Sequence, residues 1–305
     1  MTEFFKKNKK IIAVITVILL VIFSGLIYYY RYDPFAKWED EEFKSNNITL
    51  MEKETGKILY EKNGSEKVPP ASLTKIMTTL VAIENIDDIK EVVGIDVDIY
   101  KDMVKNNASM AGFYGKEPVN YEDLLYGTML SSGGEAAGTL AKAVGKGNIK
   151  NFVDMMNEKV KELGLENTHF GNPEGLDSQD TYTTAEDMAY ILKVAMENEI
   201  FRKISTSKDF VSSKTLDHPQ GLKLESTVLT PLEGQNKEGF NILGGKSGTT
   251  ENAGLCWATL GEKDGVEYIL VTLGAPLDNL SKPTPYQMQD HLIIFEKIER
   301  KKFFN

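Results

Sequence analysis

The sequence predicts a mixed α/β (α+β) fold in which helices pack on a largely antiparallel sheet and an all-helical segment is inserted into the chain. Two short strand candidates, residues 48–51 and 57–60, flank the turn signal Glu54-Thr55-Gly56 and are expected to form a hairpin. Residues 120–205 show helical periodicity with almost no strand signal, and strand patterns return in residues 209–273. This order of elements is typical of helices layered on a sheet.

The N-terminal residues predict a membrane anchor. Residues 1–10 contain four lysines and one acidic residue, and residues 11–30 contain no charged residue. Twenty helical residues span ~30 Å, about the thickness of one hydrocarbon core. Because lysine-rich flanks stay in the cytoplasm, we expect a single-pass protein of the cell membrane with a cytoplasmic tail at residues 1–10 and an extracellular stalk at residues 31–46. A cleaved signal peptide is the alternative, but this apolar run is long for one and no A-x-A-like site follows it.

Composition argues against several classes of function. A formal net charge of −10 argues against nucleic acid as a partner. The single cysteine, Cys256, cannot form an intramolecular disulfide and is expected to be a small buried hydrophobic residue. His169, His218 and His291 lie far apart in the sequence and match no metal-ligand spacing. We therefore expect neither a metal nor another cofactor.

Capping signals and periodicity place the individual elements. Asn120 can cap a helix that has acidic residues in its first turn, and Thr184 can cap another. Residues 87–118 show no clear pattern and are expected to be irregular. Helices are expected at about residues 120–130, 136–144, 149–163, 184–197 and 286–300. Strands are expected at about residues 209–213, 241–247, 255–260 and 267–273.

The stretch from Pro70 to Leu80 is the first candidate for chemistry. Apolar residues at three- and four-residue spacing predict a buried helix that opens with a proline. Ser72 and Lys75 lie three residues apart, so the hydroxyl and the amine share one helix face. A lysine can take the serine proton only when burial or a neighbouring cation keeps its amine neutral. In a first helical turn the backbone N–H of Ser72 also lacks an intrahelical partner, which offers half of an oxyanion hole.

Two further segments follow in the sequence. Lys246-Ser247-Gly248-Thr249 lies on an edge-strand candidate, where a cation and hydroxyl groups can bind a substrate carboxylate and the glycine permits close backbone approach. Ser132-Gly133-Gly134 interrupts the helical block. With Ser72 and Lys75 these segments form the ordered set S-x-x-K, S-x-[N] and K-[ST]-G, which is typical of penicillin-binding proteins and class A β-lactamases.

The chain resembles the D-alanyl-D-alanine carboxypeptidases, the low-molecular-weight penicillin-binding proteins, over most of residues 47–275. Besides the three motifs, the resemblance is carried by Thr55-Gly56-Lys57-Ile58-Leu59-Tyr60, Leu124-Leu125-Tyr126-Gly127, Thr168-His169-Phe170, Asn172-Pro173, Thr184-Ala185-Glu186-Asp187 and Ala253-Gly254-Leu255-Cys256. It implies a β-lactamase/DD-peptidase-like fold with a mainly antiparallel five-stranded sheet flanked by helices. It also implies a catalytic domain at residues 47–301, with the helical insertion at about residues 87–205.

The resemblance implies a role for each motif in peptide-bond cleavage. Ser72 would attack the carbonyl between two D-alanines of a peptidoglycan stem peptide, and Lys75 would take the serine proton. Ser132 and Lys246 would relay that proton to the departing D-alanine. The charge of Lys246 close to Lys75 would lower the pKa of the Lys75 amine, as a neutral base requires.

The resemblance also implies the binding groups and the partners. Lys246, Ser247 and Thr249 would hold the terminal carboxylate of a stem peptide that ends in D-Ala-D-Ala. The backbone N–H groups of Ser72 and Thr249 would form the oxyanion hole, with each donor contributing about 3 kcal/mol. β-Lactams would be covalent inhibitors of the same serine.

Gly134 departs from the family pattern and leaves alternatives open. Family members usually have asparagine here, which contacts the amide of the substrate; a neutral hydrogen bond of ~0.5–1.5 kcal/mol predicts about tenfold weaker turnover without it. One alternative is therefore a non-catalytic module that binds cell-wall peptide or β-lactam. A β-lactamase would need an E-x-x-L-N loop, and the sequence that begins at Glu166 does not match one. Endopeptidase cleavage of cross-links is a further alternative.

Overall fold

The computed structural model describes residues 14–22, 38, 42–235, 239–279 and 282–298. The chain divides into two units, of which the larger is Phe43–Lys297. In the smaller unit, residues 14–22 are helical and expose apolar side chains. None of the helices in the described residues combines the length and the apolar character that crossing a bilayer requires. The predicted cytoplasmic tail lies outside the described residues, as do most of the predicted anchor and stalk.

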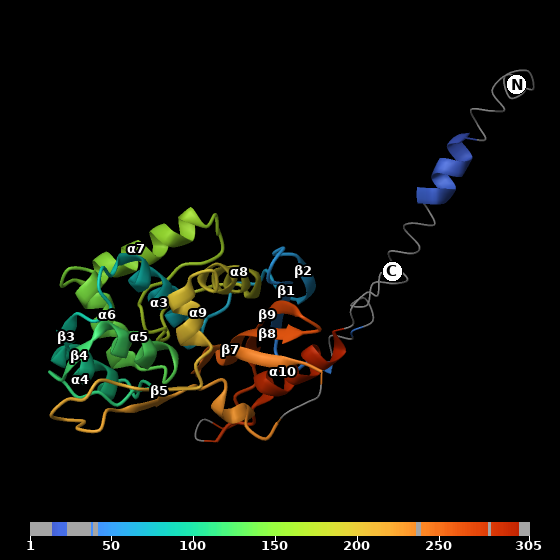
Figure 1. Ribbon diagram of the computed structural model, residues 1–305. Helices are drawn as coiled ribbons and strands as arrows, with labels where there is room; N and C mark the ends of the chain where they lie inside the picture. Colours follow the sequence, from blue (N-terminus) through green and yellow to red (C-terminus); the bar gives the residue numbers. More distant parts are fainter. Residues whose placement is uncertain (1–13, 23–37, 39–41, 236–238, 280–281, 299–305) are drawn as a thin grey trace, which may run out of the picture. The chain divides into compact units, whose positions relative to one another are not determined.

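A five-stranded antiparallel sheet lies at the centre of the larger unit, as expected (Figure 1). Its strands are, in spatial order, β2 (Ile58–Lys62), β1 (Asn47–Glu52), β9 (Val266–Ala275), β8 (Gly254–Lys263) and β7 (Asn241–Thr250). The predicted hairpin is confirmed, because β1 pairs with β2 across a turn in which Gly56 has φ +70°. A left-handed φ of this kind favours glycine. β7 is an edge strand, so its outer side is free to line a site.

Helices cover both faces of the sheet. α8 (Ala185–Ala195) packs on β9 and β1, and α10 (Tyr286–Lys297) packs on β8 and β9 from the opposite face (Figure 1). Burial on both faces explains why β8 is an almost continuous run of buried residues without alternation. Asp290 of α10 accepts hydrogen bonds from the backbone N–H groups of Lys44 and Ser45, at 3.1 and 2.7 Å, and so joins the two ends of this unit.

The segment inserted between β2 and β7 contains a helical block that packs around α3. Its helices before α8 are α3 (Thr74–Asn85), α4 (Val97–Lys105), α5 (Tyr121–Met129), α6 (Gly134–Val144) and α7 (Ile149–Glu162), and α9 (Glu199–Ser205) follows α8. The predicted caps are present: Asn120 forms a capping box with Asp123, and the Thr184 hydroxyl accepts a hydrogen bond from the Asp187 N–H.

Two expectations about this segment were wrong. Residues 87–118 are not irregular, because they contain α4 and the strand β3 (Val92–Gly94), which pairs with β4 (Pro118–Asn120). The segment is therefore not entirely helical. α4 buries Ile99 and Met103, which lie four residues apart on one face as in an amphipathic helix. Its start is fixed by Asp96, whose side chain accepts hydrogen bonds from the N–H groups of Asp98 and Ile99.

The strand expected at residues 209–213 lies outside the central sheet. β5 (Asp209–Val211) pairs with β6 (Lys223–Glu225) in a separate two-stranded ribbon. The ring of Phe210 stacks on Tyr126 of α5 with 3.8 Å between ring centroids, which fixes the ribbon to the helical block. After the ribbon, the short 3-10 helix η3 (Thr230–Leu232) precedes β7.

The core extends from the inner face of α3 to the sheet. Its largest buried side chains include Trp257, Phe113, Phe152, Phe170 and Phe201. Cys256 is fully buried within this core, as expected, and burial raises the pKa of its thiol to about 12. The thiol is therefore a packing group rather than a nucleophile.

Candidate active site

Ser72 lies in a tight turn immediately before the central helix. The turn is the 3-10 helix η2 (Ala71–Leu73), so Ser72 precedes α3 rather than lying within its first turn as predicted. Ala71 has φ +48°, a left-handed conformation that costs a residue with a Cβ atom about 1–2 kcal/mol. Strained backbone next to a partly exposed serine hydroxyl is typical of a functional site.

Lys75 lies in the first turn of α3 and contacts Ser72 directly. Its side chain is 2% exposed, and its Nζ lies 3.0 Å from the Ser72 Oγ and 2.6 Å from the Glu174 backbone oxygen. Burial lowers the pKa of Lys75 to about 8, while the negative charges of Glu174 and Glu135 act in the opposite direction. The predicted pairing of serine and lysine is therefore present, and the amine can be neutral at mildly alkaline pH.

The loop that carries Glu174 packs closely against the Ser72 turn. The Asn172 Oδ1 accepts hydrogen bonds from the N–H groups of Gly175 and Leu176, at 2.7 and 3.1 Å. A Cβ atom on Gly175, which has φ +78°, would lie 2.0 Å from the Ala71 carbonyl oxygen, so only glycine fits. The Asn172-Pro173 pair quoted for the family resemblance thus has a structural reason: it shapes the loop that positions Lys75.

β7 brings the second lysine to this site. Lys246 is fully buried, and its Nζ donates a 2.6 Å hydrogen bond to the Ser247 backbone oxygen. Burial and the charge of Lys75 lower the pKa of Lys246 well below its ordinary value. A Cβ atom on Gly248 would lie 2.9 Å from the Ser72 backbone nitrogen, so this glycine allows β7 to approach the serine turn. The structure therefore brings Ser72, Lys75 and the Lys246 segment together.

The hydroxyl residues of β7 differ in their surroundings. Ser247 donates a 2.7 Å hydrogen bond to the Thr227 Oγ1, a partner that sequence motifs did not indicate. The Thr227 N–H in turn donates to the Leu130 carbonyl, which links β7 to the end of α5. Thr249 is exposed, so its hydroxyl is available to a ligand.

Ser132 lies in the break between α5 and α6, as predicted. It is 5% exposed and has φ +59°. In the described part of the chain its hydroxyl makes no hydrogen bond, either to Lys75 or to Lys246. The break itself is well defined, because the N–H groups of Gly133 and Gly134 donate to the carbonyls of Gly127 and Ser109, at 2.9 and 2.7 Å.

Comparison with known proteins decides the family. Residues 35–277 match the family model described as D-alanyl-D-alanine carboxypeptidase, peptidase S11. The chain belongs to this family. It is 32% identical to the D-alanyl-D-alanine carboxypeptidase DacF of Bacillus subtilis and 33% identical to DacC of Escherichia coli, in each case over 76% of this chain. The matches cover 58% and 56% of these two relatives, so the chain spans somewhat more than half of their length.

A solved structure supports the fold assignment within this carboxypeptidase family. The crystal structure of the Streptomyces K15 DD-transpeptidase aligns with a TM-score of 0.73 at 27% identity, covering 84% of this chain and 97% of that one. The expected DD-peptidase-like arrangement of an antiparallel five-stranded sheet flanked by helices is thereby confirmed.

Glu135 is a second buried carboxylate near Lys75 that the motifs did not single out. It is fully buried in the first turn of α6, and its Oε1 accepts hydrogen bonds from the N–H groups of Gly112 and Phe113, at 2.8 and 3.2 Å. Burial raises the pKa of its carboxyl group. The sequence signal that could have indicated this residue is a single acid in a largely apolar helix. Through its hydrogen bonds, Glu135 links the segment before β4 to the break that contains Ser132.

Gly134 packs against Met103, which a side chain at this position would have to displace. A Cβ atom there would lie 2.7 Å from the Met103 Sδ and 3.3 Å from the Ser109 carbonyl oxygen. Met103 of α4 fills the space next to Gly134. Glu166, the acid considered for a β-lactamase, is exposed after α7 and has no hydrogen bond to Ser72 or Lys75 among the described residues.

Proposed function

We propose that this protein is a serine-type D-Ala-D-Ala carboxypeptidase that removes the terminal D-alanine from peptidoglycan stem pentapeptides. The observation that carries the proposal is the 3.0 Å contact between the Lys75 Nζ and the Ser72 Oγ in a buried site. A nucleophile within hydrogen-bond reach of a base whose pKa is lowered to about 8 is what acyl transfer requires. Membership of the carboxypeptidase family supports this choice among acyl-transfer reactions.

The first step forms a tetrahedral intermediate on Ser72. Neutral Lys75 accepts the Ser72 proton while the serine oxygen attacks the carbonyl carbon between the two D-alanines. The backbone N–H groups of Ser72 and Thr249 are proposed to bind the oxyanion, each contributing about 3 kcal/mol. The close approach of Gly248 to the Ser72 nitrogen supports this pairing, because it places the backbone of β7 next to the Ser72 turn.

The second step breaks the C–N bond of this intermediate, which releases D-alanine and leaves the acyl-enzyme ester. The proton held by Lys75 passes to the departing amine, with Ser132 and Lys246 as the proposed relay. Lys246, Ser247 and Thr249 are proposed to hold the terminal carboxylate. A carboxylate beside Lys246 raises the pKa of the lysine, so the substrate itself favours the charged form that binds it. Water then attacks the acyl-enzyme and regenerates Ser72.

The proposal places the enzyme at the cell membrane as a single-pass protein. Residues 11–30 would span the bilayer, with residues 1–10 in the cytoplasm and the catalytic unit outside. The supporting observations are the twenty uncharged residues and the four lysines before them. Peptidoglycan stem peptides and β-lactams are encountered on that side of the membrane.

A binding or sensing module without turnover is the second candidate. Gly134 favours it, because the family asparagine that contacts the substrate amide is absent and Met103 occupies the adjacent space. The two candidates differ in whether D-alanine is released after Ser72 is acylated.

The test uses the full chain in detergent with a fluorescent penicillin and with a pentapeptide that ends in D-Ala-D-Ala. We expect covalent labelling and D-alanine release, both lost in Ser72→Ala and retained in Ser65→Ala, which removes an exposed serine on the same segment. Labelling without release would favour the binding module. Rapid loss of the label with hydrolysed drug would favour a β-lactamase, and no labelling would overturn the assignment of Ser72.

A further inference from the structure

Thr227 lies between two of the segments that carry the catalytic motifs. On one side, the Ser247 Oγ of β7 donates a 2.7 Å hydrogen bond to the Thr227 Oγ1. On the other side, the Thr227 N–H donates a 3.1 Å hydrogen bond to the carbonyl of Leu130, two residues before Ser132. Thr227 therefore contacts the strand of the Lys246 motif through its side chain and the end of α5 through its backbone.

The surrounding backbone fixes where the Thr227 side chain lies. Its two neighbours are turned inwards, because Ser226 is 2% exposed and Val228 is fully buried. The Ser226 N–H donates to the Lys208 carbonyl at 2.8 Å, and the Ser226 Oγ accepts hydrogen bonds from the N–H groups of Val228 and Leu229. Thr227 is only half-buried. Because a β-branched side chain is also stiff about its first torsion, the Thr227 hydroxyl is held in place.

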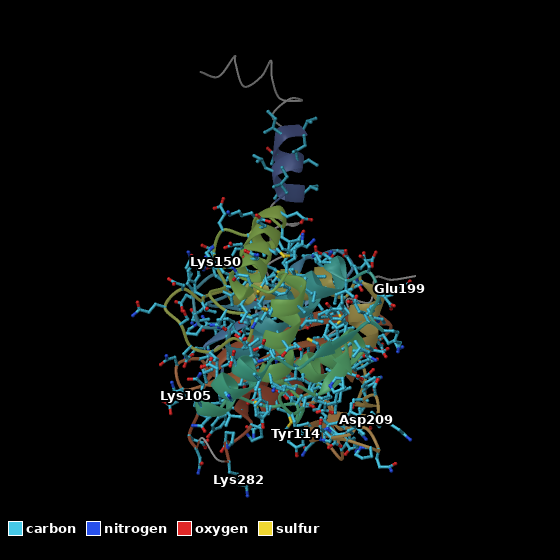
Figure 2. All side chains as sticks on the ribbon, turned by 90° about the vertical axis from the view of Figure 1, so that its left-hand side faces the viewer. Lys105, Tyr114, Lys150, Glu199, Asp209 and Lys282 are labelled. Carbon is cyan, nitrogen blue, oxygen red and sulfur yellow. The ribbon has the colours of Figure 1, made fainter. Side chains whose placement is uncertain are left out.

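The ribbon of β5 and β6 brings this segment to the surface. Asp209, the first residue of β5, lies at the surface of the larger unit (Figure 2). It pairs with Glu225 of β6, which is also exposed and lies two residues before Thr227. The chain therefore leaves the ribbon at a point that solvent reaches, and a ligand that arrives from solution can contact Thr227.

The direction of the hydrogen bond between the two hydroxyls determines which of them can serve a ligand. Ser247 has one hydroxyl proton, and this proton is donated to the Thr227 Oγ1. The Thr227 hydroxyl accepts that hydrogen bond and retains its own proton, for which the described part of the chain supplies no acceptor. A carboxylate only accepts hydrogen bonds, so the hydroxyl with the free proton is the one that suits it.

The contact with α5 does not explain why this residue is a threonine. That contact uses only the backbone N–H, which every residue except proline has. The hydroxyl is needed only for Ser247 and for whatever accepts the remaining proton. Hydrogen bonds to a charged acceptor are stronger than those between neutral groups, so an anionic ligand gains most from this proton.

We propose that the Thr227 hydroxyl donates a hydrogen bond to the terminal carboxylate of the substrate, and that Ser247 orients this hydroxyl. The inference rests on the proposed carboxypeptidase function and adds Thr227 to the groups that bind its substrate. It also changes the role of Ser247 from a direct donor to the residue that positions the donor. Because the carboxylate is present in the bound substrate and in the transition state alike, the contact should affect KM rather than kcat.

Binding is measured without turnover in a Ser72→Ala background. The full chain in detergent is titrated calorimetrically with diacetyl-L-lysyl-D-Ala-D-Ala and with the same peptide ending in a carboxamide. Adding Thr227→Val, which removes the hydroxyl and keeps the shape, should weaken binding of the carboxylate peptide about fivefold or more and that of the carboxamide less than about twofold. Thr227→Ser should restore the affinity. Thr55→Val, which removes an exposed hydroxyl in the turn between β1 and β2, should not change it.

Three results would overturn the inference. Equal weakening for both peptides would mean that Thr227 only holds β7 and α5 together. Unchanged or tighter binding in Thr227→Val would mean that Ser247, freed from Thr227, is itself the donor. Absence of saturable binding of the carboxylate peptide would mean that no carboxylate site exists here.

The proposed function is judged separately, from D-alanine release by the protein with Ser72 intact. If release is absent while the binding difference is present, the carboxypeptidase proposal fails and Thr227 remains a carboxylate-binding residue. If release occurs, Thr227→Val should raise KM about fivefold or more while kcat stays within about twofold of the wild type. A fall in kcat at constant KM would contradict the inference.

Discussion

Lys75 meets Glu174 in two ways. Its Nζ donates a 2.6 Å hydrogen bond to the Glu174 backbone oxygen, and the Glu174 carboxylate acts on the same amine through space without forming an ion pair. The carbonyl fixes where the amine lies, whereas the carboxylate affects how readily it holds a proton. One residue that lies far from Lys75 in the sequence thus affects both the position of this amine and its pKa, although burial has the larger effect on the pKa.

The pH dependence of acylation follows from this arrangement. With a Lys75 pKa of about 8, the second-order rate of acylation by a penicillin should rise as pH increases through about 8, because the neutral amine is the base. Glu174 raises the pKa of Lys75, so Glu174→Gln should move this limb to lower pH. Stopped-flow measurement of the acylation rate between about pH 6 and 10 gives the midpoint of this pH dependence. A midpoint that stays in place or rises in the variant would contradict the electrostatic role.

Gly134 should not accept the family asparagine without a change in Met103. We expect Gly134→Asn to lower the free energy of unfolding by ~1–3 kcal/mol, the usual result of overpacking, because the new Cβ atom meets the Met103 Sδ. Met103→Ala removes that atom. In the double variant the two losses should therefore be less than additive, as judged by urea unfolding of all four proteins. A fully stable Gly134→Asn variant would show that the α4 side chain moves aside freely.

Gly175 offers a test of the contact between the Asn172 loop and the serine turn. Gly175→Ala places a Cβ atom 2.0 Å from the Ala71 carbonyl oxygen, and we expect acylation by penicillin to fall at least tenfold because Ser72 and Lys75 shift. Gly164→Ala is the matched control, since Gly164 has φ +72° but no atom within 4 Å of its built Cβ. Both variants share the cost of an unfavourable φ, ~1 kcal/mol. Equal labelling rates in the two variants would show that the contact has no functional role.

His291 should make the protein sensitive to acid. The ring is fully buried between Thr259 and Thr272, whose hydroxyls lie 3.0 Å from its two nitrogens, and burial lowers its pKa from 6.5 to about 3. Between these values the unfolded chain binds a proton that the folded protein does not. Stability contributed by the neutral ring is therefore complete above pH 6.5 and is lost as pH falls towards 3.

This loss can be measured against a variant without the titrating group. When the pH falls from well above 6.5 to one unit below it, the free energy of unfolding of the wild type should decrease by ~1.4 kcal/mol because of this residue. His291→Gln lacks that contribution, so its stability should fall less over the same interval. Urea unfolding at these two pH values gives the loss of stability for the wild type and for His291→Gln. Equal losses in the two proteins would show that His291 is not the group responsible.

Local signals in the sequence were sufficient for much of the fold. Asn120 and Thr184 cap helices because their side chains find donors within three residues, and the turn at Gly56 closes its hairpin for an equally local reason. The pairing of Ser72 with Lys75 also depends only on residues three apart. Each of these features is determined by residues that are close together in the sequence, and short sequence patterns therefore predict it.

Features that depend on distant contacts were missed. α4 is an exception, because it was missed although its signals are local: Asp96 caps it, and its buried residues Ile99 and Met103 lie four residues apart. Glu174 acts on Lys75 from 99 residues away, and Gly134 is explained only by Met103. The sequence showed that Gly134 differs from the family; the reason required the packing of α4 against α6.

The order of strands in the central sheet has a consequence for how the chain folds. β1 comes first in the sequence but pairs with β9, so that Asn47 lies opposite Leu273. The sheet can therefore close only after both ends of the compact unit are present, whereas the helices between them form from near neighbours. Loop-closure entropy makes such a sheet slow to assemble. Folding should thus begin in the helical block. Until β9 pairs with it, β1 should have hydrogen-bonding partners only on the side of β2.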